Sequence, residues 1–174
     1  MFSRLFAKYF HTARLDWKRW HCIEAIYSSK RARLWPLWQN LPRCAVQGDF
    51  STNNVLIDKN GKIVSLIDFN IAGSEVLIND LITQAMFISE IMDLAEGLQD
   101  ADRFNLFRIF IEEYLRHRPL TEPELAAMNS TYNLASSFFW PVIEDLEQLL
   151  AGGDYQKANE VLEDILQSLT CQIF

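Results

Sequence analysis

The chain of 174 residues contains only six glycines, and none of them lies in a cluster that could cradle a phosphate group. Phosphate-binding loops need closely spaced glycines, because a residue without a Cβ atom lets the backbone approach the phosphate. No lysine lies on a predicted strand that is followed by a glutamate on a helix. These residues therefore lack the usual means of gripping the phosphates of a nucleotide.

Cysteines and long apolar runs are scarce as well. Cys22, Cys44 and Cys171 form no Cys-x-x-Cys pair, and their odd number argues against a disulfide framework. We therefore expect reduced, buried thiols in a cytoplasmic protein. No apolar run approaches the roughly 20 residues that a membrane-spanning helix needs, so we expect no membrane partner.

Charge is unevenly distributed along the chain, whose net charge is −7. Residues 1–43 carry nine lysines and arginines against two acids, whereas acids dominate the remainder. A basic segment can bind nucleic acid or a membrane surface, but these basic residues are interleaved with a regular apolar stripe. We favour a solvated helix face, or a contact with protein surface outside this chain, over a nucleic-acid partner.

The period of the apolar residues changes once in the first half of the chain. Spacings of three and four predict an amphipathic helix over residues 3–28 and a short second helix over about 30–40, which ends near Pro42. Short apolar runs then predict strands at 44–46, 55–57 and 62–67. The last two runs flank Asp58-Lys59-Asn60-Gly61, a turn sequence, and should form a β-hairpin.

Helical spacing returns after Gly73 and continues to the end of the chain. The predicted helices cover residues 77–91, 104–115, 124–150 and 154–169. Thr121 and Glu124 have the spacing of a capping box, so a helix should begin there. Pro141 should kink or split the stretch 124–150, and Gly152-Gly153 should end it.

The most informative segment places Asp49 in a loop, Asn54 five positions later, and Asp68 beyond the predicted hairpin. The hairpin would fold the chain back so that Asn54 and Asp68 lie side by side. Asp49 could then accept the proton of a hydroxyl nucleophile. An amide oxygen and a carboxylate are oxygen ligands of the kind that Mg²⁺ prefers. Each residue alone would be an ordinary loop residue, but the three together favour phosphoryl transfer from Mg²⁺-bound ATP.

These residues carry a resemblance to a known family. The segment Val46–Leu56 with Ile67-Asp68-Phe69 resembles the Brenner-type catalytic loop of the aminoglycoside phosphotransferase and choline kinase superfamily. Ala72-Gly73 with Asp80-Leu81 is similar to the family's segment that supports this loop. Tyr9–Ala13 resembles the helix that opens the family's C-terminal lobe. The resemblance covers about residues 5–95 and is strongest over residues 46–81.

The resemblance implies a role for each matching residue. Asp49 would be the catalytic aspartate, Asn54 and Asp68 the Mg²⁺ ligands, and Gln47 and Asp80 the supports of the catalytic loop, with ATP as the phosphoryl donor. Gln47 stands where the family usually has a histidine that orients the loop by hydrogen bonds, and glutamine can also donate and accept. The larger departure is that the family's N-lobe is absent from these residues.

We therefore predict an α+β fold: a mostly helical C-lobe of the protein-kinase-like fold with a small β-hairpin that carries the site. It would be a single domain, made of a basic helical segment (1–43), the catalytic loop and hairpin (44–74) and a helical subdomain (75–174). The first functional hypothesis is an ATP- and Mg²⁺-dependent phosphotransferase for a small-molecule hydroxyl, completed by an N-lobe from another chain or a longer gene product. The second is a non-catalytic remnant that forms a homodimer through the exposed interlobe face.

The acceptor site is less defined. Glu75, Glu144 and Asp145 could form an acidic wall for a cationic substrate, although a solvated helix face is the simpler interpretation. Phe138-Phe139-Trp140 could form an aromatic box for a quaternary ammonium group, although core packing is the simpler interpretation. Sugars, aminoglycosides, choline, homoserine and protein hydroxyls all remain open as acceptors.

Overall fold

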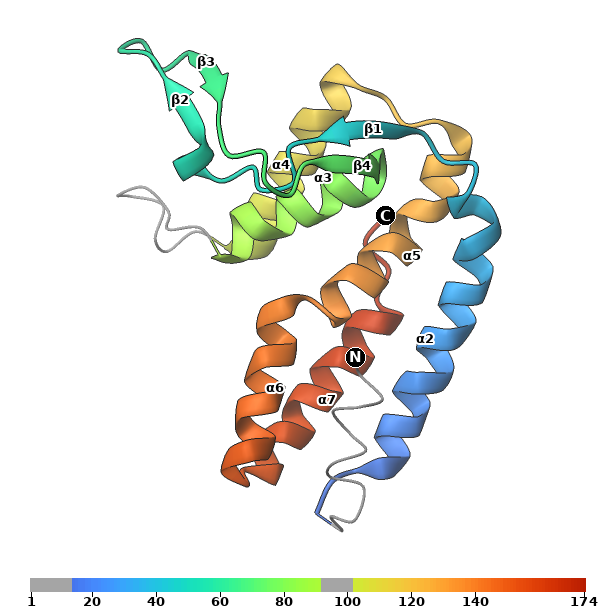
Figure 1. Cartoon of the computed structure of the whole chain (residues 1–174). Coiled ribbons are helices and arrows are strands. Elements are labelled where there is room, and N and C mark those ends of the chain that lie inside the picture. The colour runs from blue at the N-terminus through green and yellow to red at the C-terminus, as the bar shows by residue number, and fades with distance from the viewer. Residues whose placement is uncertain (1–13, 92–101) are drawn as a thin grey trace. The chain divides into compact units, whose positions relative to one another are not determined.

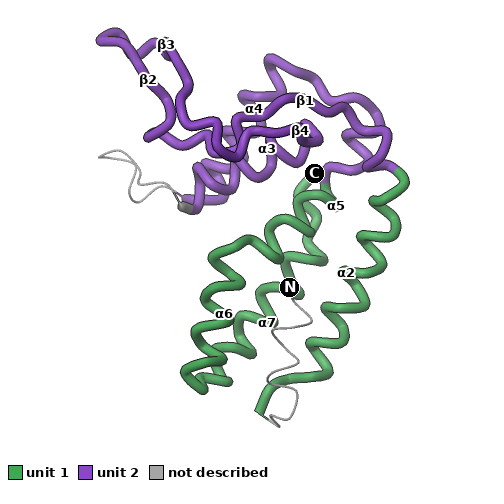
Figure 2. Tube along the Cα trace, in the orientation of Figure 1, with its two compact units in different colours: residues 1–36, 129–174 green, residues 37–128 purple. Residues whose placement is uncertain are grey.

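The computed structural model describes residues 14–91 and 102–174 (Figure 1). The fold is α+β and mostly helical, with two small antiparallel sheets. The chain separates into two compact units, shown in different colours in Figure 2. Unit 1 consists of Met1–Pro36 and Asn129–Phe174, and unit 2 is Leu37–Met128. The single domain expected from the sequence, with segments that end at residues 43 and 74, stays a prediction.

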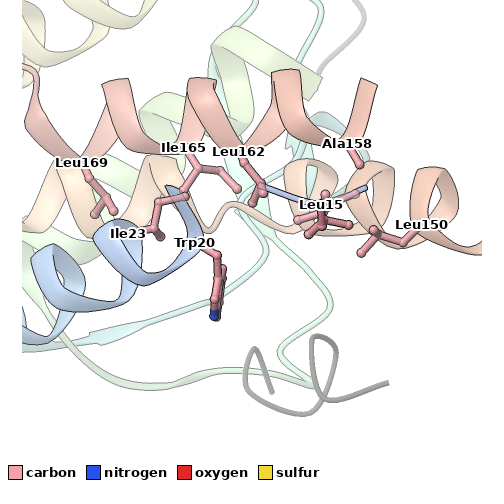
Figure 3. Packing of buried hydrophobic residues seen from close by; sticks show 9 residues of the cluster. Leu15, Trp20, Ile23, Leu150, Ala158, Leu162, Ile165 and Leu169 are labelled. Atoms are coloured by element: carbon pink, nitrogen blue, oxygen red, sulfur yellow. The ribbon is translucent and has the colours of Figure 1, made fainter. Parts of the chain in front are cut away.

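Unit 1 is built from helices. They are α2 (Trp17–Trp38), the second half of α5 (Glu122–Ser137), α6 (Trp140–Gly152) and α7 (Tyr155–Thr170). Their buried apolar side chains meet in one core, in which Ile23 of α2 lies with Leu150 of α6 and Leu162 of α7 (Figure 3). Complete burial of such a side chain contributes roughly 1.5–3 kcal/mol. The apolar stripes seen in the sequence therefore account for this unit.

Helix α2 differs from the prediction. It runs from Trp17 to Trp38 without the break expected near residue 29, because the Ser28-Ser29 pair has only a modest penalty in a helix. The side chain of Asp16 caps its start, with Oδ1 accepting the Arg19 N–H at 2.9 Å. Residues 3–13 of the predicted first helix lie outside the described residues.

The helix boundaries in the second half of the chain are confirmed. α5 ends at Ser137 and α6 begins at Trp140 with a proline in its first turn, as expected from Pro141. Gly153, at a φ of 76°, follows α6 in the left-handed conformation. Asp154 then caps α7 by accepting the Lys157 N–H at 3.2 Å. Local signals were sufficient here because caps and breaks act within one turn.

Unit 2 contains both sheets. β1 (Arg43–Val46) pairs antiparallel with β4 (Gly73–Val76). α3 (Leu77–Met86) follows, contacts both strands, and continues into the π-helical turn η2 (Phe87–Ile91). α4 (Arg103–His117) packs against α3. The predicted helix start at Leu77 is confirmed, but the preceding strand β4 was not predicted; its backbone groups are satisfied by pairing with β1.

The predicted hairpin is confirmed. β2 (Val55–Ile57) pairs antiparallel with β3 (Ile63–Leu66), and in Figure 1 the pair projects from the rest of unit 2. In the turn, Asp58 Oδ1 accepts the backbone N–H groups of Asn60 at 2.8 Å and Lys62 at 3.0 Å. Gly61 adopts a φ of 79°, which suits a residue without a Cβ atom. Short-range turn chemistry thus sets the hairpin that carries the candidate site.

The three cysteines are free, but they are not buried as expected. Cys22 is exposed, and Cys44 and Cys171 are partly buried. Helix α2 directs Trp20 and Ile23 into the core, so Cys22 lies off the buried face. Within the described ranges, no helix combines the length and the apolar character that crossing a membrane requires.

Candidate functional site

The loop between β1 and β2 begins with a sharp backbone turn. Gly48 has a φ of 91°, and a Cβ atom at this position would lie 2.6 Å from the carbonyl oxygen of Ile71. A contact this short is sterically forbidden to any residue with a side chain. The loop backbone therefore lies directly against the segment that follows Asp68.

Asn54 lies at the end of the short 3₁₀ helix η1 (Thr52–Asn54) and is buried. Its Nδ2 donates to the backbone carbonyl oxygen of Asp49 and to Asp49 Oδ2, both at 2.9 Å. Both partners can only accept, so the nitrogen of the amide must face Asp49. The Oδ1 atom of Asn54 is consequently the group that this side chain can offer to a cation.

The hairpin returns the chain to this loop. The N–H of Ile67 donates to the carbonyl oxygen of Asn54 at 2.9 Å. Asp68 directly follows Ile67 in the chain, so this hydrogen bond brings Asp68 close to Asn54. Asp68 is exposed and has a φ of 56°, the left-handed region that non-glycine residues seldom adopt. Its Oδ1 accepts the Asn70 N–H at 3.3 Å. The folded-back arrangement expected from the sequence is therefore present.

Gln47 connects the two halves of the site. Its Oε1 accepts the Asp49 N–H at 2.8 Å, and its Nε2 donates to the carbonyl oxygens of Ile67, at 3.1 Å, and Asp68. One side chain thus contacts both the loop that carries Asp49 and the backbone that carries Asp68. The structure brings Gln47, Asp49, Asn54 and Asp68 together, while their roles in catalysis stay a prediction.

Asp80 lies in the first turn of α3 and forms a hydrogen bond with Gln84 on the same helix. Burial raises the pKa of the Asp80 carboxyl group, the hydrogen bond from Gln84 lowers it, and the charge of Glu75 raises it further. Burial also raises the pKa of the neighbouring Cys44 thiol, with the charge of Asp80 as the next cause. These electrostatic interactions place Asp80 near Cys44 of β1 and Glu75 of β4, and its support of the catalytic loop stays a prediction.

The predicted acceptor-binding residues are divided between the two units. Glu75 is on β4 in unit 2, whereas Glu144 and Asp145 are exposed on α6 in unit 1. The acidic wall therefore stays a prediction. Within the aromatic run, Phe138 packs against the core of unit 1 and meets Tyr27 edge to face, with 5.0 Å between ring centroids.

The donor set fits Mg²⁺ in its chemistry. An amide oxygen and a carboxylate are hard ligands, and Mg²⁺ commonly takes one or two protein ligands together with phosphate oxygens and water. No group of three His, Cys, Asp or Glu side chains arranged for a metal ion occurs in the part of the chain that the structure describes. Two such oxygen ligands would leave the other coordination positions of a Mg²⁺ ion to phosphate oxygens and water.

Sequence reasoning did not identify the packing role of Gly48. The signal was available, because Gly48 is the only glycine between residues 1 and 60 and directly precedes Asp49. The contact with Ile71, in contrast, joins positions 23 residues apart and is visible only in the folded chain.

Comparisons with known proteins bear on the family of this chain. A family model described as the phosphotransferase enzyme family matches residues 1–120. The homoserine kinase of Methylobacillus glycogenes is 33% identical over 100 residues, which cover 58% of this chain and 29% of that protein. The homoserine kinase of Methylobacillus flagellatus is 32% identical over 102 residues, which cover 59% of this chain and 30% of that protein. The chain thus spans about 30% of the length of these curated relatives. No solved structure matches it.

Proposed function

Because the chain belongs to the phosphotransferase enzyme family, we propose that it takes part in transferring the γ-phosphoryl group of ATP to a hydroxyl group of a small molecule. The observation that supports this most directly is the pair of hydrogen bonds from Asn54 to Asp49, formed where the hairpin returns the chain to Asp68. A catalytic carboxylate and two oxygen ligands are the protein groups that this chemistry needs on one side of the nucleotide.

Asp49 acts as the base in this proposal. As the bond between the acceptor oxygen and the γ-phosphorus forms, the bond from that phosphorus to the β,γ-bridging oxygen breaks and ADP leaves. The hydroxyl proton passes to the Asp49 carboxylate late in the reaction. Asn54 Oδ1 and the Asp68 carboxylate would hold Mg²⁺, which supplies charge neutralisation on the phosphates. The amide nitrogen of Asn54 meanwhile orients Asp49.

We propose that the remaining phosphate contacts come from an N-lobe outside these 174 residues, on another chain or in a longer gene product. The sequence contains no glycine-rich loop with a lysine partner, and its curated relatives are more than three times as long as the matched region. The free thiols of all three cysteines are in keeping with a cytoplasmic location.

Homoserine is the first acceptor to test, because the two curated relatives are named homoserine kinase. Its amino group is cationic at neutral pH, and either Glu75 of unit 2 or the pair Glu144 and Asp145 of unit 1 would suit such a group. The same residues would also suit an aminosugar or choline, so a panel of hydroxyl acceptors is needed.

Calorimetric titration of ATP into the purified chain, with and without Mg²⁺, tests the proposal. We expect Mg²⁺-dependent binding that Asp68→Asn weakens by at least about tenfold and that Asp49→Asn retains, because Asp68 is the proposed metal ligand and Asp49 the proposed base. Asp164→Asn, at an exposed position of α7, is the control and should match the wild type. Absence of binding at millimolar nucleotide would exclude catalysis by this chain alone.

A second function is favoured by the exposed apolar residues of the hairpin. Ile57 and Val64 are 63% and 61% exposed, and Phe69 beyond the hairpin is 57% exposed. We propose, as the alternative, a non-catalytic module that forms a homodimer through this surface. Light scattering from about 5 to 500 μM protein should then show dimers that Ile57→Lys abolishes, and a monomer throughout that range would exclude this alternative.

A further inference from the structure

The segment that follows α7, residues 171–174, belongs to unit 1 and runs alongside α5 in Figure 1. Its backbone starts in an extended conformation, because Cys171 has a φ of −65° and a ψ of 153°. Burial alternates along it: Cys171 and Ile173 are partly buried, whereas Gln172 and Phe174 are exposed. A period of two is that of an extended chain with one side against a surface. The segment therefore lies in unit 1 as an extended peptide lies in a binding site.

Asn129 of α5 binds the backbone of this segment through both ends of its side-chain amide. Its Oδ1 accepts the N–H of Ile173 at 2.9 Å and that of Phe174 at 3.4 Å. Its Nδ2 donates to the carbonyl oxygen of Cys171 at 3.1 Å. A carbonyl oxygen and the N–H two residues later are the two groups that one residue of a neighbouring parallel strand would bind. These contacts therefore select an extended backbone that has an N–H group at position 173.

Asn133, one turn further along α5, completes the arrangement and is fully buried. Its Nδ2 donates to the carbonyl oxygens of Ser168, at 2.7 Å, and Cys171, at 3.1 Å, and to Cys171 Sγ at 3.2 Å. Its Oδ1 accepts from Asn129 Nδ2 at 3.0 Å and from Lys30 Nζ at 2.9 Å. Every donor and acceptor position of the two amides is used, so both amides are held in one orientation.

We propose that Asn129 and Asn133 form a peptide-binding site, which recognises an extended segment by its backbone and is occupied in this structure by residues 171–174. The site lies within unit 1 and is independent of the proposed phosphotransferase function. Its ligand is an extended peptide with an aliphatic residue in the place of Ile173 and an aromatic residue in the place of Phe174.

The side chains of the segment account for this preference. The ring of Phe174 meets that of Tyr132 edge to face, with 6.1 Å between ring centroids, and the partly buried Ile173 lies on the inner side of the segment. In the recognition of extended peptides, backbone hydrogen bonds supply affinity and alternate side chains supply selectivity. Asn129 and Asn133 provide the first of these, and Tyr132 contributes to the second.

The occupant can be exchanged while the helices stay folded. The buried core of unit 1 reaches along α7 to Leu169, one residue before this helix ends at Thr170. Phe174, at the far end of the segment, is 41% exposed. A segment that is held mainly by side-chain amides outside the core opens at a lower free energy than the helices do. A separate peptide of the same chemistry can therefore replace it.

The first test asks whether Asn129 holds the segment in the full chain. Hydrogen exchange of the Ile173 amide is measured by NMR in the wild type, in Asn129→Leu and in the control Asn105→Leu, at an exposed position of α4. We expect exchange at Ile173 to be about tenfold faster in Asn129→Leu, because the acceptor of its N–H is lost. The control should keep the wild-type rate. Equal rates in all three chains would overturn the site.

The second test asks whether a separate peptide binds. In the full chain, Ile173→Pro combined with Phe174→Pro removes both N–H groups that Asn129 accepts and so weakens the occupant. The probe is a capped peptide with the sequence of residues 171–174, and a copy with an N-methyl group on its isoleucine is the control. We expect the side-chain amide signals of Asn129 to shift with a Kd of about 1 mM for the probe, in a titration to about 10 mM. The N-methylated copy should bind at least about tenfold more weakly.

The outcomes of the titration decide between recognition and simple packing of the segment. Unchanged signals throughout the titration, or equal affinities for the two peptides, would overturn recognition through the backbone. Addition of Asn129→Leu to the double-proline chain should abolish the shift of the Asn133 side-chain amide, and a retained shift would overturn the assignment to Asn129. Melting temperatures within about 3 °C of the wild type show that the variants are folded. If the double-proline chain does not fold, the exchange rates of the first test decide.

Discussion

The helical core of unit 1 and the β2–β3 hairpin of unit 2 both carry large apolar side chains, but they bury them to different extents. Ile23 and Leu162 are 0% exposed, whereas Ile57 and Val64 are 63% and 61% exposed. A helix can bury one apolar stripe against its neighbours, while an isolated two-stranded hairpin covers neither of its faces. Apolar residues in unit 1 therefore stabilise the fold, whereas those of the hairpin stay largely exposed.

The largest effect should come from the core of unit 1. Leu162→Ala removes a fully buried side chain and leaves a cavity, so we expect the free energy of unfolding to fall by about 2–5 kcal/mol. Chemical denaturation followed by circular dichroism measures this change. Leu56→Ala, at a position that is 45% exposed on the hairpin, is the matched control and should cost well under half as much. Equal losses in the free energy of unfolding at Leu162 and Leu56 would contradict the proposed difference between the two regions.

A buried ion pair should give the next largest effect. Glu124 of α5 is fully buried and accepts from Arg118 Nη2 at 2.8 Å and from the Thr121 N–H at 2.9 Å. Glu124→Gln should lower the free energy of unfolding by about 1–3 kcal/mol, because it weakens both contacts. Glu122→Gln, at an exposed position of the same helix, is the control. A cost within the error of that control would show that the pair is not stabilising.

The same residue predicts a pH dependence. Burial by itself raises the pKa of Glu124, but hydrogen bonds from Thr121 and Arg118 outweigh it and hold the pKa below the ordinary value of 4.5. The stabilisation is therefore complete above pH 4.5 and is lost as the pH falls through the lower folded-state pKa. Asp80, whose pKa is raised, changes stability in the opposite direction. The wild type minus Glu124→Gln difference should thus shrink upon acidification below pH 4.5, and a constant difference would contradict the assignment.

Gly48→Ala should produce a smaller but localised effect. The left-handed φ of 91° by itself predicts a loss of about 1–2 kcal/mol. A Cβ atom 2.6 Å from the Ile71 carbonyl oxygen should in addition displace the Asp49 loop. Gly73→Ala is the matched control, because a Cβ atom there would meet no atom within 4 Å. Backbone chemical shifts of Asp49 and Asp68 should move in the first variant and stay constant in the second. Movement in neither variant would show that the loop does not depend on this contact.

The smallest effect on stability should come from the hairpin. Val64→Thr keeps a β-branched side chain at an exposed strand position, so unfolding should change by less than about 0.5 kcal/mol. Self-association, where it occurs, should weaken at the same time. Thermal unfolding measures the change in stability, and light scattering on the same sample measures the change in self-association. A stability loss above about 1 kcal/mol would mean that the residue packs against the fold.

Much of the fold could be predicted from local patterns. The hairpin, the helix start at Thr121 and the breaks at Pro141 and Gly153 were each indicated by residues within one turn of the feature. Caps and turns depend on groups a few residues apart, so a single sequence is sufficient to place them. Local patterns failed in α2, where a break was predicted near residue 29 and the helix is continuous. The weak helix propensity of the two serines there is overridden once the helix packs against its neighbours.

Other features of the site were beyond local patterns. The β4 strand was not predicted, since its extended form depends on pairing with β1 about 30 residues earlier. The three contacts of Gln47 could be anticipated only as support for the loop, and their partners at Ile67 and Asp68 became evident from the folded chain. No sequence pattern indicated the positive φ of Asp68, because aspartate residues seldom adopt this conformation.

The sequence by itself determined the β2–β3 hairpin, the helix boundaries in the second half of the chain, and the spacing of Asp49, Asn54 and Asp68, because periodicity and turn chemistry act over short distances. The tertiary structure alone decided which apolar residues are buried, how β4 pairs, and that Gln47 joins the two halves of the site. Burial and long-range hydrogen bonds depend on which distant segments meet, and that outcome is a property of the whole folded chain.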